Sequence, residues 1–168
     1  MAKIGVIGAG SWGTALALLL YKNGCEVSVW SALKDEIDML NREHEQKDKL
    51  PGVKLPEDMI FTTNLKEAIE EKDVLILAVP SPFTRSTAAQ MAPYVSEGQK
   101  IVNVAKGIEE TTLMTLSEII EEEIPKADVS VLSGPSHAEE VGRGIPTTIV
   151  VGSKTRETAE YLQNLFMN

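Results

Sequence analysis

Six residues near the N-terminus constrain the fold more than any other feature of the sequence. Residues 8–13 read Gly-Ala-Gly-Ser-Trp-Gly and follow the apolar run Lys3–Ile7, which has the length of a buried strand. In the spacing G-x-G-x-x-G, Gly8 makes a tight turn, Gly10 leaves room for a phosphate, and Gly13 lets the next helix pack closely on the sheet. N–H groups at the start of that helix would hold a pyrophosphate. The segment predicts a dinucleotide site, with a purely structural turn as the alternative.

Strand-like and helix-like segments alternate along the rest of the chain. This order predicts one α/β domain over residues 1–168, a doubly wound, mainly parallel sheet of the Rossmann type. The polar segment 43–60 contains two prolines and is expected to cover part of the ligand site. The predicted strands are residues 3–7, 26–30, 61–63, 74–79, 100–105, 129–132 and 147–151. The predicted helices are residues 12–23, 33–42, 65–71, 81–94, 112–123, 138–141 and 155–166.

Composition narrows the class of protein. The formal net charge of −9 argues against a nucleic-acid partner, because phosphate backbones are held by clustered lysine and arginine. No apolar stretch approaches the roughly 20 residues of a membrane span. The first predicted strand begins almost at the N-terminus, so we expect no signal peptide and a cytoplasmic protein. Cys25, His44 and His137 are the only cysteine and histidine residues. A structural zinc site needs four such ligands, so we expect no metal site.

Ligands of such sheets bind outside the carboxyl ends of the strands. The loops that follow the predicted strands should therefore face one crevice. Besides the glycine turn, these loops are Ser31–Lys34, Pro80–Phe83, Lys106-Gly107 and Ser133–His137.

The end of the second strand bears on the choice between NAD and NADP. A carboxylate there would bond the ribose 2′-hydroxyl and repel a 2′-phosphate. Residues 30–34 contain none, and Ser31 and Lys34 are suited to a phosphate. Asp35 and Glu36 could serve a ribose if the loop folds back. Both cofactors therefore remain open.

Two loops carry candidate ligands for an anion. Lys106 directly follows a buried strand, where it would hold an anion or transfer a proton; a solvated lysine at the strand end is the alternative. Ser136 is predicted to cap the short helix that follows it. His137 has no recognisable partner for a role as a base. Arg143, between two glycines, either contacts an anion or lies exposed in its loop.

Three separated motifs together resemble the bacterial NAD(P)-dependent glycerol-3-phosphate dehydrogenases. They are residues 8–15 (GAGSWGTA), 104–109 (VAKGIE) and 132–140 (LSGPSHAEE), and the resemblance covers all 168 residues. It implies reversible hydride transfer between NAD(P)H and dihydroxyacetone phosphate, which yields sn-glycerol 3-phosphate for glycerophospholipid synthesis. It gives His137 no role.

The resemblance also implies which residues bind each ligand. The implied substrate ligands are Lys106, Gly134 and Ser136. The implied cofactor ligands are Gly8, Gly10, Ser11, Trp12, Gly13, Ala32, Leu33, Lys106 and Ala138.

This sequence departs from the family at two points. Members often carry histidine or arginine after the tryptophan of the second strand, where this chain has Ala32-Leu33. The family continues into a helical C-terminal domain, which holds the proton-donating lysine and is absent from residues 1–168. The resemblance therefore implies no catalytic residue in this chain, nucleotide binding without turnover, and a possible homodimer of the full-length protein.

Two other functions remain open. One is a two-domain dehydrogenase of the β-hydroxyacid or ketopantoate type, which would share the opening fold but need a different substrate loop. The other is a nucleotide-sensing or interaction module without catalysis.

Overall fold

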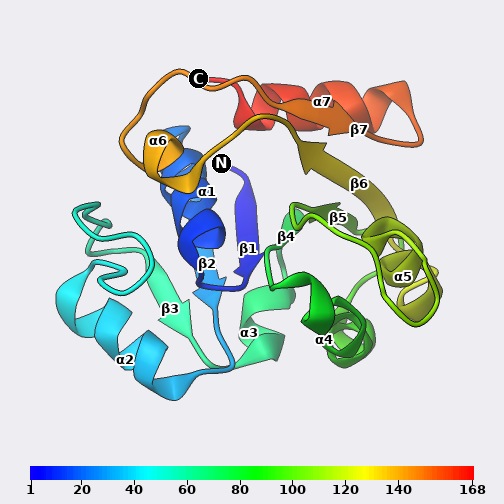
Figure 1. The fold of residues 1–168 in the computed structure, drawn as a ribbon, viewed down its shortest axis with the longest axis horizontal. Coiled ribbons are helices and arrows are strands. Elements are labelled where there is room, and N and C mark those ends of the chain that lie inside the picture. The colour runs from blue at the N-terminus through cyan, green and yellow to red at the C-terminus, as the bar shows by residue number, and fades with distance from the viewer.

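The computed structural model describes residues 1–168 and contains one seven-stranded sheet in the order β3-β2-β1-β4-β5-β6-β7 (Figure 1). β1 to β6 pair in parallel and β7 pairs antiparallel to β6. The predicted doubly wound, mainly parallel α/β fold is thus confirmed. The strands are β1 (Lys3–Ile7), β2 (Glu26–Trp30), β3 (Ile60–Thr62), β4 (Val74–Leu77), β5 (Lys100–Asn103), β6 (Asp128–Ser133) and β7 (Val150–Gly152).

Helices cover both faces of the sheet. The helices α1, α6 and α7 pack together on one face, and α3, α4 and α5 on the other (Figure 1). None of the helices combines the length and the apolar composition that a membrane span requires. The helices are α1 (Ser11–Lys22), α2 (Lys34–Glu43), α3 (Leu65–Ile69), α4 (Thr84–Met91), α5 (Leu116–Glu123), α6 (Ala138–Gly142) and α7 (Arg156–Phe166), with short 3₁₀ turns at η1 (Ser81–Phe83) and η2 (Ala92–Tyr94).

The central strands alternate between two apolar cores, one on each face of the sheet. In β4, Val74 and Ile76 join the core beneath α1, whereas Leu75 and Leu77 join the core formed with α3, α4 and α5. All four side chains are completely buried. A strand buried on both faces has a continuous apolar sequence, which is why this strand could be predicted.

Two predicted helices differ in the structure. The helix expected from residue 112 begins at Leu116, because Thr115 and Glu118 form a capping box that sets its first turn. Leu113, expected on the buried face, is 72% exposed and has a left-handed backbone with φ of 61°. The helix expected over residues 81–94 is divided into η1, α4 and η2.

A glycine within β1 brings the sheet and α3 into backbone contact. A Cβ atom on Gly5 would lie 2.0 Å from the Ala68 carbonyl oxygen and 2.9 Å from Cδ2 of Leu75. Real Cβ atoms do not approach a backbone oxygen so closely, so α3 would have to move away from the sheet. Gly5 therefore fixes how closely α3 packs.

We predict that Gly5→Ala lowers the free energy of unfolding by about 1–3 kcal/mol, the usual cost of overpacking a core. Gly152→Ala in β7 is the control, because its Cβ atom would meet nothing within 4 Å. In this control, alanine lowers the conformational entropy of the unfolded chain, so stability should stay unchanged or rise by up to about 1 kcal/mol. Urea denaturation measures both, and equal effects would contradict the packing argument.

Candidate functional site

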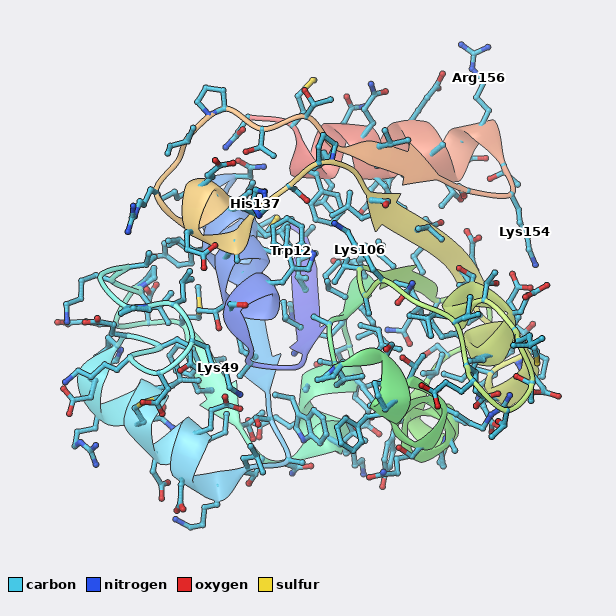
Figure 2. All side chains as sticks on the ribbon, viewed as in Figure 1. Trp12, Lys49, Lys106, His137, Lys154 and Arg156 are labelled. Carbon is cyan, nitrogen blue, oxygen red and sulfur yellow. The ribbon has the colours of Figure 1, made fainter.

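A cavity of about 930 Å³ lies at the carboxyl ends of the central strands, where β1 separates β2 from β4. In an open α/β sheet this point of strand-order reversal is the usual ligand site. Figure 2 labels Trp12, Lys49, Lys106 and His137, four lining residues from separate segments. The lining comprises Gly8–Trp12, Trp30–Leu33, Glu36, Lys49, Ala78–Ser81, Phe83, Ser86, Thr87, Gln90, Val104–Lys106 and Ser136–Glu139.

The three motif glycines differ in what surrounds them. Gly8 has φ of +122°, and a Cβ atom there would lie 2.8 Å from the carbonyl carbon of Ala78. A Cβ atom on Gly13 would lie 2.1 Å from the Gly8 carbonyl oxygen, whereas one on Gly10 would meet nothing within 4 Å. The fold itself therefore requires Gly8 and Gly13. Gly10 borders open space in the cavity.

The start of α1 is electrostatically suited to an anion. Its N-cap residue is Gly10, which has no side chain to accept hydrogen bonds from the first N–H groups, and its first turn contains no acidic residue. The helix dipole and these free N–H groups place partial positive charge at the cavity. A phosphate group would find donors here without displacing a side chain.

Glu36 supplies a carboxylate at the end of β2, although residues 30–34 contain none. It comes from the first turn of α2, lines the cavity, and its side chain is only 9% exposed. One oxygen accepts a hydrogen bond from Ser31 Oγ at 2.6 Å. The other accepts from Gln46 Nε2 at 2.9 Å and Lys49 Nζ at 2.5 Å. Of the two carboxylates expected to reach this end of the site, Glu36 lines the cavity and Asp35 does not. The part that Glu36 plays in cofactor choice stays a prediction.

Ser31 and Lys34, the groups expected to favour a 2′-phosphate, bind other groups of the protein instead. The Ser31 hydroxyl donates to Glu36 and accepts from the Leu33 N–H group at 3.1 Å. Lys34 pairs with Asp38 at 2.5 Å, and this hydrogen bond raises the lysine pKa. Lys34 lies outside the cavity lining, whereas Lys49 lies within it.

Sequence reasoning missed Lys49 and Gln46, which lie in the segment predicted only as a covering loop. Gln46 is completely buried and joins two parts of the site, because its Nε2 also donates to the Ala9 carbonyl at 2.7 Å. Nothing in the sequence distinguishes Lys49 from the neighbouring Lys47, which pairs with Glu43 at 2.7 Å. The prolines and polarity of the segment signalled a loop near the site without identifying these contacts.

Lys106 reaches from the end of β5 toward the loop after β6. Its Nζ donates to the Gly134 carbonyl at 3.2 Å, and it forms no ion pair. The buried Asn103 side chain bonds the N–H and carbonyl groups of Ala105 at 3.3 and 3.1 Å, which fixes the chain just before the lysine. Lys106 therefore presents an unneutralised charge to the cavity.

The segment before α6 lies partly in the cavity. Ser136, His137 and Ala138 line it, whereas Gly134 is not among the lining residues and its carbonyl accepts a hydrogen bond from Lys106. The N-cap of α6 is His137, so the prediction that Ser136 caps this helix was wrong. Arg143 follows the end of α6, is exposed, and lies outside the cavity.

One wall of the cavity was not predicted residue by residue. Phe83 in η1 and Ser86, Thr87 and Gln90 in α4 line it. Pro80–Phe83 was expected near the site from its place after a strand, but the face that α4 turns to the cavity depends on where η1 ends. The expected loops thus meet in one cavity, and the ligand roles of their residues stay predictions.

Residues 3–159 match the family model of the NAD-dependent glycerol-3-phosphate dehydrogenase N-terminus. The chain belongs to this family.

Its relatives are longer than the chain. The glycerol-3-phosphate dehydrogenase [NAD(P)+] of Agathobacter rectalis is 62% identical over 168 residues, which are the whole chain and 50% of that protein. The crystal structure of glycerol-3-phosphate dehydrogenase from Coxiella burnetii superposes with a TM-score of 0.93 at 30% identity, over 99% of this chain and 51% of that one. The chain thus spans about half the length of the relatives it matches.

A more distant structural neighbour shares the fold alone. The GDP-mannose dehydrogenase of Pseudomonas aeruginosa superposes with a TM-score of 0.79 at 18% identity, over 99% of this chain and 44% of that one. Dehydrogenases named for different substrates therefore share this architecture, and the substrate has to be inferred from the residues of the site.

Proposed function

We propose that this chain is the cofactor-binding half of an enzyme that interconverts dihydroxyacetone phosphate and sn-glycerol 3-phosphate with NAD(P)H. One observation carries the proposal: the three family motifs, far apart in the sequence, contribute Gly8–Trp12, Val104–Lys106 and Ser136–Glu139 to a single cavity. We also propose a role in glycerophospholipid synthesis, which the family membership supports.

The residues of the cavity fit a nicotinamide dinucleotide. Its pyrophosphate would take the space beside Gly10 and bond the N–H groups of Ser11 and Trp12, where the helix dipole adds attraction. Ala32 and Leu33 line the end of the cavity where the adenosine ribose is expected, and Ala138, at the start of α6, also lines the cavity. When bound, this cofactor supplies or accepts the hydride.

Lys106 is proposed to anchor both ligands. It is the lysine of the cavity that forms no ion pair, so its charge is available to a substrate phosphate or a developing oxyanion. Ser136 and Gly134 would hold the substrate beside it. Protonation of the carbonyl is assigned to a lysine in the second half of the relatives, as the family resemblance implies. Residues 1–168 then bind the cofactor but do not complete the reaction.

The proposal is tested first by whether the reading frame continues beyond Asn168, and then by assay of the full-length protein. We expect oxidation of NADH or NADPH with dihydroxyacetone phosphate, and none by residues 1–168 alone. Turnover of ketopantoate instead would support the other dehydrogenase class. Cofactor binding without turnover of either substrate would support a sensing module. Activity of residues 1–168 alone would contradict the division of labour between the two halves.

We predict that Gly10→Val abolishes cofactor binding while the fold remains intact. The new side chain would occupy the space proposed for the pyrophosphate. Its Cβ atom would meet no protein atom within 4 Å, and the backbone φ of −70° suits any residue. Calorimetry with NADH measures binding, and thermal unfolding checks the fold. Gly152→Val, distant in β7, should bind as the unmodified chain does. Equal binding by the Gly10 variant would refute the phosphate position.

Cofactor choice depends on the Glu36–Lys49 pair in this proposal. The Glu36 carboxylate is placed to accept from a ribose 2′-hydroxyl and would repel a 2′-phosphate. Lys49 Nζ lies 2.5 Å from the Glu36 carboxylate and neutralises its charge. The same side chain can turn to a 2′-phosphate instead. Because the pair carries no net charge, the affinities for NADH and NADPH should lie within about tenfold, or about 1.4 kcal/mol.

We predict opposite shifts when either partner loses its charge. Glu36→Gln should move the ratio of the two affinities toward NADPH, since the repulsion is removed. Lys49→Met should move it toward NADH, since the carboxylate is then unopposed. Lys34→Met is the control, because that lysine is paired with Asp38 outside the cavity. Titration of cofactor fluorescence measures the ratio, and an unchanged ratio in both charge variants would reject this assignment.

A further inference from the structure

The loop that follows Lys106 is held to the protein without apolar burial. Between Lys106 and Thr115 no residue is buried, and Ile108 and Leu113 are 53% and 72% exposed. Internal hydrogen bonds give the loop a shape: the Glu109 N–H group donates to the Met114 carbonyl at 2.9 Å, and the Leu113 N–H group donates to the Glu109 carbonyl at 2.8 Å. These bonds do not attach the loop to the domain.

A single side chain on α4 provides the attachment. Arg85 donates from Nε to one oxygen of Glu109 at 2.7 Å and from Nη2 to the other at 2.8 Å, a bidentate pair. Its Nη2 also lies 3.7 Å from the Met114 sulfur. Glu109 and Met114 are the two residues of the loop that are partly shielded from solvent, and both are contacts of Arg85. The loop is therefore docked at this guanidinium.

Arg85 is itself fixed on its other side. Its Nη1 donates to Glu122 at 2.5 Å and to Glu123 at 2.8 Å, both in the last turn of α5. Exposed single ion pairs contribute little, but a bidentate arginine shared among several carboxylates has the geometry in which such pairs are effective. Arg85 thus joins α4, α5 and the loop at one point.

Lys106 lies between two such attachments, each three residues away. Asn103 brackets Ala105 on the preceding side, and Glu109 holds the following side to Arg85. Between them Gly107 has φ of +131°, and a Cβ atom there would lie 3.2 Å from Ser81 Oγ. The neighbours of Arg85 on α4, Ser86 and Thr87, line the cavity wall. Arg85 therefore connects the loop that carries Lys106 to the helix α4, which forms that wall.

We propose that Arg85 is a positioning residue, which acts through Glu109 to hold Lys106 at the reaction site. This inference rests on the proposed function, in which Lys106 anchors the substrate. Arg85 touches neither ligand in this arrangement. Its loss should release the loop, let the Lys106 side chain leave the cavity, and weaken substrate binding, while the glycine turn continues to bind the cofactor.

The first test measures kinetics of the full-length enzyme with dihydroxyacetone phosphate. Arg85→Met and Glu109→Gln should each raise KM about tenfold or more, because small displacements of a binding group are costly. Lys106 also contacts the cofactor in the proposed function, so NADH affinity should fall as well. The fall should stay below about threefold, or under 1 kcal/mol, because the glycine turn holds the pyrophosphate independently of the loop. Arg85→Lys keeps the charge but loses the bidentate geometry, so it should recover part of the loss. In a Lys106→Met background, Arg85→Met should add nothing further.

Arg156→Met is the matched control, since Arg156 pairs with Glu160 on α7, away from the cavity (Figure 2). It should leave KM unchanged. An increase in KM from Arg85→Met that is equally large in the Lys106→Met background would overturn the proposal. So would a parallel loss of cofactor and substrate binding, which would indicate general damage to the fold.

A second measurement does not depend on activity. Amide hydrogen exchange of residues 107–115 in the 168-residue chain should accelerate at least tenfold in Arg85→Met and stay unchanged in Arg156→Met. Unchanged exchange in the Arg85 variant would reject the attachment, whatever the enzyme does. Faster exchange in a full-length protein that does not use dihydroxyacetone phosphate would instead reject the proposed function, and with it the role of Arg85 in that reaction.

Discussion

The backbone contact between Gly8, Gly13 and Ala78 is the constraint on which the cavity depends. A Cβ atom on Gly13 would come within 2.1 Å of the Gly8 oxygen, so α1 begins directly against the turn that leaves β1. Gly8 in turn lies against Ala78 at the end of β4, across the point where the strand order reverses. The first N–H groups of α1 therefore face the crevice. A larger residue at either glycine would move the helix off the sheet and its donors away from the ligand.

Local charges decide what this cavity can hold, although the chain as a whole is acidic. With a net charge of −9, the average field disfavours a phosphate. At physiological salt, however, exposed charges farther than about 8 Å are largely screened. Within the cavity Lys49 is balanced by Glu36, so the uncapped start of α1 and the unpaired Lys106 remain as the attractive groups. The carboxylate that opposes them is Glu139, which lines the cavity from the first turn of α6. An anion is thus attracted to the pyrophosphate and substrate ends, and the ribose end stays neutral.

The sequence predicted features that arise from burial and from backbone geometry. The strand β4 was recognisable because every side chain in it is buried, although the predicted range 74–79 extends two residues beyond Leu77. The glycine turn was recognisable because its spacing reflects steric needs. Features that depend on polar contacts between distant residues were not predictable. The start of α5 was placed too early because Leu113 has the spacing of a buried face but lies in an exposed loop. Glu36 was only one of two alternatives, since its position depends on Gln46 and Lys49 in a segment without regular structure.

The features that the sequence did not predict depend on how the loops of the site are attached to the domain. The core strands are fixed by apolar contacts on both faces, whereas the loops after β2 and β5 are held by hydrogen-bonded carboxylates. Glu36, in the first turn of α2, holds the loop after β2 through Ser31, and Glu109 in the loop after β5 holds that loop to Arg85. A change in such a polar attachment alters the position of a ligand group without opening a cavity in the core. At the Arg85–Glu109 attachment, where the side chains are 31% and 19% exposed, the freed groups can turn to water and the cost to stability is small. At Glu36, which is only 9% exposed, the loss would leave the buried Gln46 side chain without one of its hydrogen-bond partners and would cost more. Cofactor preference and substrate affinity can therefore vary among proteins that keep this sheet and its glycine turn.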